Sequence, residues 1–210
     1  PKNGNTYQSF KGQMEIIGEN SSLKGIVRDM EYDSVSGIHS FPEINFAWDH
    51  NNSFNVWLEP LNLDHLSNLI SNFLEPDHQI KKWADGLRPR GVIDNARINL
   101  NKFGIAFSAD LTDLKVNSYN GVPRASIRKS YLSGHNRNLS LFITGSTAEI
   151  AFPELFDDVW SYEDVTGTIQ FALLRDGYFG VHGTDFSVAV GNIKTKGGFA
   201  LTYPRDSAER

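Results

Sequence analysis

The chain has 210 residues, a net charge of −5 and no cysteine. This length suits one sizeable folded domain. The composition excludes disulfides and thiolate chemistry, and the acidic balance argues against a nucleic-acid partner, which needs a basic surface. No apolar run reaches the ~20 residues of a membrane-spanning helix. Because the chain opens on Pro1 rather than Met, we expect residues 1–210 to be a single-domain fragment of a longer protein.

The first sixty residues alternate between apolar and polar side chains, which is the period of strands with one buried face. Strands are expected over 9–17 and 21–33. The stretch PEINFAWD then places Ile44, Phe46 and Trp48 on one side. After the Asn-rich turn HNNS, the stretch FNVWLEP returns with the same period, which is typical of a hairpin.

The period changes within residues 61–90, the predicted helical insert. Apolar residues three and four apart predict an amphipathic helix over 64–74. A shorter helix is expected over 77–86, with Gly86 as its terminator. Since the apolar face of the first helix must be buried, we expect it to cover part of the sheet. The covering residues are Leu66, Leu69, Ile70 and Phe73.

Strand patterns resume after the insert. The stretch FGIAFSADLTDLKV carries apolar residues at every second position from Phe103 to Leu111. Turn signals such as NG at 120–121 and GNIKTKGG at 191–198 separate the strands. The predicted strands are 91–101, 103–116, 124–133, 138–144, 147–152, 165–175, 178–190 and 197–203.

These patterns predict a mainly β fold with one helical insertion near 64–86. The sheet is expected to be antiparallel and twisted or curled, in the form of a groove or an open sandwich. Its strands come from the two β segments, 1–60 and 91–203, on either side of the insert.

Patterns typical of enzymes are not found in the sequence. The six histidines lack the spacing of zinc sites, and there is no nucleophile elbow or phosphate-binding glycine loop. The acidic pairs at 157–158 and 163–164 lie in a stretch that reads as a connection, so they are expected to be solvated rather than a glycosidase pair. We therefore expect no catalytic activity, no cofactor and no metal site.

The apolar strand faces allow two interpretations. They can pack on an opposing sheet as the core of a sandwich, which the alternation alone favours. The chain would then be a structural or carbohydrate-binding module, with Trp57 or Trp160 as the contact. Alternatively, the same faces can line a groove for an apolar ligand.

Three motifs and the elements before them decide between these interpretations. LRPRGVIDNARINL begins at Leu87, FSADLTDLKVNSYNGVP at Phe107 and STAEIAFPELF at Ser146. In this order, after the hairpin and the amphipathic helix, they resemble the central region of YhdP-type AsmA-like proteins, large envelope proteins of Gram-negative bacteria. One departure is that Arg124 stands where the family has a glycine after the proline.

The resemblance implies a periplasm-spanning β structure that is anchored in the inner membrane by regions outside this fragment. Its sheet curls into an apolar groove that conducts phospholipid between the inner and outer membranes. The implied partners are phospholipid acyl chains and neighbouring segments of the same chain. The positions expected to line the groove are Ile44, Phe46, Trp48, Phe103, Ile105, Phe107, Leu111, Ile169, Phe171 and Leu173.

Overall fold

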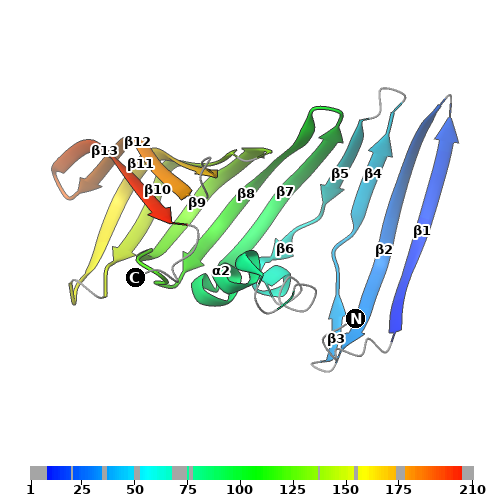
Figure 1. Ribbon diagram of the computed structural model, residues 1–210, viewed down its shortest axis with the longest axis horizontal. Coiled ribbons are helices and arrows are strands. Elements are labelled where there is room, and N and C mark those ends of the chain that lie inside the picture. The colour runs from blue at the N-terminus through cyan, green and yellow to red at the C-terminus, as the bar shows by residue number, and fades with distance from the viewer. Residues whose placement is uncertain are drawn as a thin grey trace.

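A computed structural model describes residues 9–19, 21–34, 37–49, 53–67, 75, 78–136, 138–153, 156–173 and 178–204. The strands are β1 (Ser9–Glu19), β2 (Ser22–Ser34), β3 (Gly37–Ser40), β4 (Ile44–Trp48), β5 (Phe54–Leu58), β6 (Leu61–Asn62), β7 (Arg90–Asn101), β8 (Gly104–Val116), β9 (Arg124–His135), β10 (Asn138–Ala151), β11 (Val159–Leu173), β12 (Tyr178–Val190) and β13 (Ile193–Pro204). In the described parts of the chain they form one antiparallel sheet of 13 strands (Figure 1).

The sheet is open. Its main path runs β1-β2-β4-β5-β7-β8-β9-β10-β11-β12-β13, while β3 pairs with β2 and β6 with β7. Because most strands lie beside their neighbours in sequence, short hairpin turns suffice to connect most of them. Figure 1 shows a single layer whose last strands, β12 and β13, curl toward the viewer. The predicted fold class, an open and curled antiparallel sheet, is confirmed.

A series of β-bulges crosses the sheet. Asp29, Asn95, Asp113, Gly145 and Asp185 have φ between 50° and 54°, and each lies where its strand has an extra residue relative to its partner. Asp, Asn and Gly tolerate this left-handed conformation better than other residues. Bulges increase the local twist of a sheet, so their repetition favours the observed curl.

Three predicted strand boundaries are wrong, and bulges explain the first. Residues 138–151 form one strand, β10, because the chain passes Gly145 as a bulge rather than a turn. The acidic stretch 157–164 is not a connection, since β11 begins at Val159 and pairs with β10 from there. The segment 191–198 is mostly strand, because β13 begins at Ile193 and pairs with Val190.

The described helices are short. Residues 63–67 are helical, and α2 spans Gln79–Leu87. Gly86 therefore lies within α2 and does not terminate it. Its missing side chain makes room for the ring of Tyr119, which also meets Trp83 edge-on at 5.6 Å between ring centroids. None of the helices in the described part of the chain is long and apolar enough to span a membrane.

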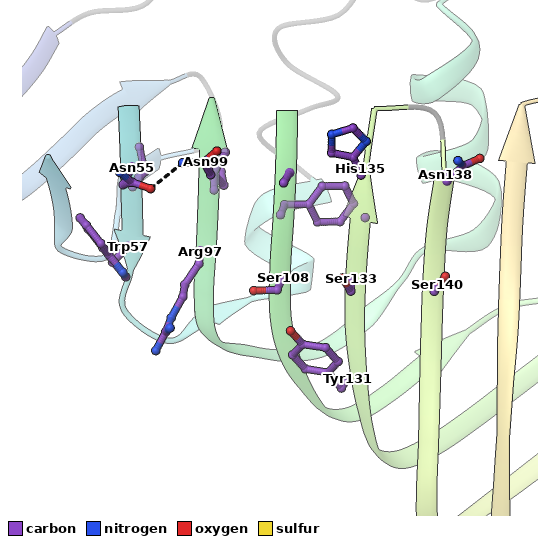
Figure 2. Close-up of a pocket in the computed structure, with 15 residues that line it drawn as sticks. Asn55, Trp57, Arg97, Asn99, Ser108, Tyr131, Ser133, His135, Asn138 and Ser140 are labelled. Carbon is purple, nitrogen blue, oxygen red and sulfur yellow. Dashed lines mark hydrogen bonds between the residues drawn. The ribbon is translucent and has the colours of Figure 1, made fainter. Parts of the chain in front are cut away.

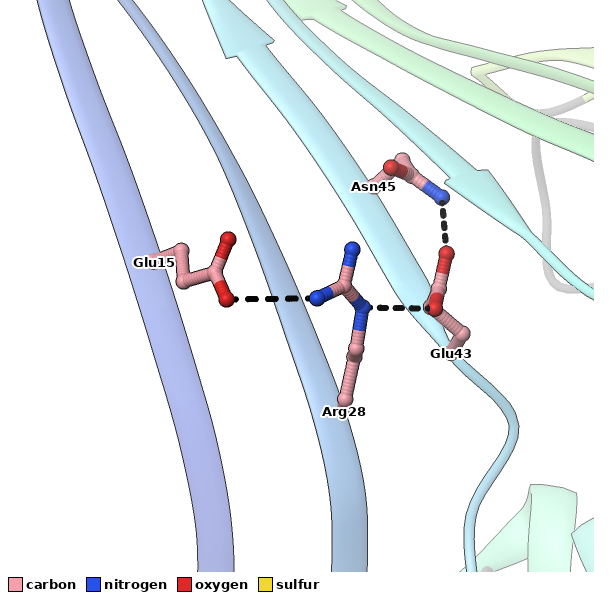
Figure 3. A network of polar contacts seen from close by, with 4 residues as sticks. All are labelled: Glu15, Arg28, Glu43 and Asn45. Carbon is pink, nitrogen blue, oxygen red and sulfur yellow. Dashed lines mark hydrogen bonds and ion pairs between the residues drawn. The ribbon is translucent and has the colours of Figure 1, made fainter.

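A polar network ties the first strands together (Figure 3). Arg28 on β2 donates to Glu15 on β1 at 3.2 Å and to Glu43, just before β4, at 3.0 Å. Asn45 donates to the other oxygen of Glu43 at 3.1 Å. Because all three charged side chains reach solvent, each ion pair contributes at most about 1 kcal/mol.

Candidate functional site

One face of the sheet is apolar across the whole main path. In an antiparallel sheet, directly opposed residues share a face, so the register can be followed from strand to strand. The central row consists of Ile16, Gly25, Phe46, Val56, Ile98, Phe107, Gly134, Leu139, Phe171, Val181 and Leu201. Every member is an apolar residue or glycine. We call this side of the sheet the apolar face and the other side the polar face.

The rows on either side of the central row have the same character. One contains Leu23, Trp48, Phe54, Leu100 and Ile105. The other begins at β1 with Met14, Val27, Ile44 and Leu58. The register therefore joins hydrophobic runs from distant parts of the chain into one continuous surface.

Phenylalanine rings lie over glycines on this face. The ring of Phe46 occupies the space that a side chain at Gly25 would need, and Phe107 does the same at Gly134. The pair of Phe199 and Gly183 repeats the arrangement near the other edge. A glycine within a strand permits this close approach. The rings consequently lie low on the sheet and give the apolar face a smooth floor.

Burial differs along the apolar face. A buried core of side chains extends from β8 to β11 and consists of Leu111, Ile127, Leu141, Ile143, Ala148 and Val165. Toward β1 the same face is uncovered. The exposed side chains there, which we call the open apolar stretch, are Met14, Ile16, Leu23, Phe54, Leu100 and Ile105.

The structure brings most of the predicted lining residues together. Ile44, Phe46 and Trp48 lie half-buried on the apolar face of β4. Ile105 and Phe107 continue that surface on β8. Ile169 and Phe171, which lie on the same face, pack against the buried core from β11.

Three predicted lining residues differ from the rest. Phe103 lies in the turn before β8 rather than in the strand, and the amino group of Lys102 is 5.0 Å from its ring centre. Leu111 is on the apolar face but belongs to the buried core, so protein rather than a ligand surrounds it. Leu173 is the last residue of β11 and pairs with Phe179 in the backbone register.

The predicted covering helix lies largely outside the described residues. Of its four residues, Leu66 is half-buried within the helical segment 63–67. Leu69, Ile70 and Phe73 are not among the described residues. The nearby helix α2 is held at the end of β8, where the N–H of Asn117 donates to the carbonyl of Leu87 at 2.7 Å.

Sequence reasoning missed all but one residue of the open apolar stretch, namely Met14 and Ile16 on β1, Leu23 on β2, Phe54 on β5 and Leu100 on β7. The alternation at Met14 and Ile16 is visible in the sequence. What the sequence does not show is the register, which sets these residues on the same face as Phe46 and Phe107.

Polar atoms on the apolar face are few and do not form a reactive group. The Ser146 hydroxyl accepts from the N–H of Lys129 at 2.9 Å and donates to the carbonyl of Thr147 at 3.2 Å. The Ser130 hydroxyl is buried beside Leu111 without a hydrogen-bond partner. Among the described residues, no group of three His, Cys, Asp or Glu side chains is placed to hold a metal ion. Within the described residues, what this face offers is mainly apolar contact.

Known proteins add nothing to this description: no protein-family model, no curated protein and no solved structure matches the chain.

Proposed function

We propose that this chain is a groove-forming segment of a YhdP-type AsmA-like envelope protein, and that it binds and conducts phospholipid between the inner and outer membranes. The observation that carries the proposal is the open apolar stretch. Exposed apolar area of this extent costs free energy in water, at about 25 cal/mol per Å2. An acyl chain lying on the stretch would remove that area from water.

The shape and chemistry of the apolar face suit acyl chains. Saturated chains offer no hydrogen bonds, so a binding surface needs continuity and smoothness rather than specific polar partners. The central row crosses every strand of the main path without a charged side chain. The phenylalanines over Gly25 and Gly134 keep its floor flat.

The proposal also says where the segment lies in the cell and which segments adjoin it. On this proposal the segment lies in the periplasm of a Gram-negative bacterium, and the inner-membrane anchor belongs to regions outside residues 1–210. The edge strands β1 and β13 each leave one side of their backbone unpaired within the described sheet. Neighbouring segments of the same chain would pair there and lengthen the groove, which protects edges that otherwise promote aggregation.

Two matched isoleucine substitutions test the proposal. Ile105 lies on the apolar face and Ile17 on the polar face, and both side chains are exposed. We expect Ile105→Glu to reduce the amount of phospholipid that copurifies with the protein, measured by mass spectrometry, because an acyl chain bound there would strip water from the new carboxylate. Ile17→Glu should leave it unchanged. If neither the native protein nor Ile17→Glu carries phospholipid, the proposal is wrong.

A further inference from the structure

The polar face carries a hollow of about 640 Å3 over β5, β7, β8, β9 and β10 (Figure 2). Strand order runs left to right in Figure 2 and right to left in Figure 1, so the two views show opposite sides of the sheet. Two rows of polar-face residues line most of the hollow, which is also bordered by Val56, Ile98, Phe107 and Gly134 of the central row. The first is Trp57, Arg97, Ser108, Ser133 and Ser140, and the second is Asn55, Asn99, Ala106, His135 and Asn138.

Aromatic rings stand on both sides of a floor of short side chains. The floor is formed by Ser108 and Ser133, which are half-buried. Trp57, 39% exposed, stands on β5, and Tyr131, 42% exposed, stands on β9. Tyr131 is supported from β10 by Phe142, with 6.0 Å between ring centroids. Three strand intervals separate the two rings, which is about 14 Å across the sheet.

The second row contains a fixed ladder of amide groups. The Asn99 amide nitrogen donates to the Asn55 side-chain oxygen at 2.7 Å and to the Ser53 hydroxyl at 2.8 Å (Figure 2 shows the first). The Asn99 oxygen accepts from Asn101 at 2.6 Å. Because Asn99 is held by three hydrogen bonds, this wall of the hollow is ordered before any ligand arrives, which lowers the entropic cost of binding.

Other polar groups in the hollow remain open to a ligand. In the described part of the chain, no side-chain hydrogen bond or ion pair engages the Arg97 guanidinium or the hydroxyls of Ser108 and Ser133. Arg97 pairs across the strands with Trp57, so a guanidinium donor lies beside the exposed indole. The lining contains no carboxylate, which disfavours a divalent cation as the ligand.

We propose that this hollow binds a saccharide. A sugar ring has an apolar C–H face and a rim of hydroxyls that both donate and accept. The exposed rings of Trp57 and Tyr131 suit the apolar C–H face, since aromatic side chains combine an apolar surface with a polar edge. The Ser, Asn and Arg side chains can hydrogen-bond with the rim of hydroxyls. This site lies on the face opposite the open apolar stretch and does not depend on lipid binding.

Calorimetric titration of the purified protein with a panel of neutral and acidic oligosaccharides tests the proposal. We expect at least one oligosaccharide to bind, and Trp57→Ala to weaken its binding roughly tenfold or more, because an exposed aromatic contact is lost. Trp160→Ala is the matched control, because Trp160 is similarly exposed but packs against Phe152 and Phe156 away from the hollow. This control should bind with native affinity.

A second experiment distinguishes a free glycan from one carried by a lipid. Vesicles with and without a glycolipid are compared with the soluble oligosaccharides, and Trp57→Ala is applied to each. Binding of soluble sugars identifies a free glycan, and sugar-dependent vesicle binding alone identifies a lipid-borne one. The proposal is overturned if no saccharide binds in either form at millimolar concentration, or if Trp57→Ala binds as tightly as the native protein.

Discussion

The middle of the apolar face is buried and its β1 end is exposed, although the same alternation produces both. From β8 to β11 the bulged and curled sheet brings side chains such as Leu141 and Val165 into one buried core. From β1 to β5 the strands lie flatter in Figure 1, and Ile16 and Leu23 remain exposed on the same face. The curled strand β13 also leaves Phe199 and Leu201 exposed on this face, so position in the sheet, rather than residue type, separates the buried core from the exposed surface.

The difference assigns separate roles to the two regions. The buried region stabilises the sheet, because it removes apolar area from water without outside help. The open region adds little to the stability of the isolated chain and is free to contact a ligand. Substitutions of one residue type in the two regions should therefore have unequal effects on unfolding.

The largest expected effect comes from shortening a leucine in the core. Leu141 is 5% exposed and Leu23 is 42% exposed, and both lie on the apolar face. We expect Leu141→Ala to lower the free energy of unfolding by about 2–4 kcal/mol, because it leaves a cavity. Leu23→Ala should cost less than about 1 kcal/mol. Urea unfolding measures both, and equal losses would contradict the division into a core and an open surface.

A smaller effect is expected where a ring lies on a glycine. A methyl group at Gly134 would overlap the Phe107 ring, whereas at Gly197 it would meet nothing within 4 Å. We expect Gly134→Ala to destabilise the protein by about 1–3 kcal/mol through overpacking. Gly197→Ala should be neutral or stabilising by up to ~1 kcal/mol, because alanine restricts the unfolded chain. Thermal unfolding of the two variants measures the difference. If both are destabilised, overlap with the Phe107 ring is not the reason that the strand glycines are needed.

Much of the fold follows from the two-residue period. The alternation at Ile44, Phe46 and Trp48 predicts that they share a face, and the register confirms it. The period breaks at bulges, so the sequence predicts two strands on either side of Gly145 where the structure has the single strand β10. The acidic side chains of residues 157–164 are typical of a solvated connection, yet β11 begins within them.

The candidate site depends on information that the local sequence does not contain. The residues of the open apolar stretch are recognisable one strand at a time, but only the pairing of β1 with β2 and of β2 with β4 joins Ile16 to Phe46. The curl is equally hard to predict, because the bulges that favour it, such as those at Asn95, Asp113 and Asp185, become apparent only from the strand pairing. The position of Trp57 opposite Phe54 and Val56 was readable, whereas the small side chains of β8 and β9 beside it were not.

Photo-crosslinking at two adjacent isoleucines tests the central claim most directly. Ile16 is 55% exposed on the apolar face of β1, and Ile17 is 73% exposed on the polar face. A photoreactive residue is placed at each position in turn, in cells that make the full-length protein, and attached phospholipid is identified by mass spectrometry. The account predicts phospholipid on residue 16 and none on residue 17. Equal labelling, or none at residue 16 in the folded protein, would contradict a lipid-binding apolar face.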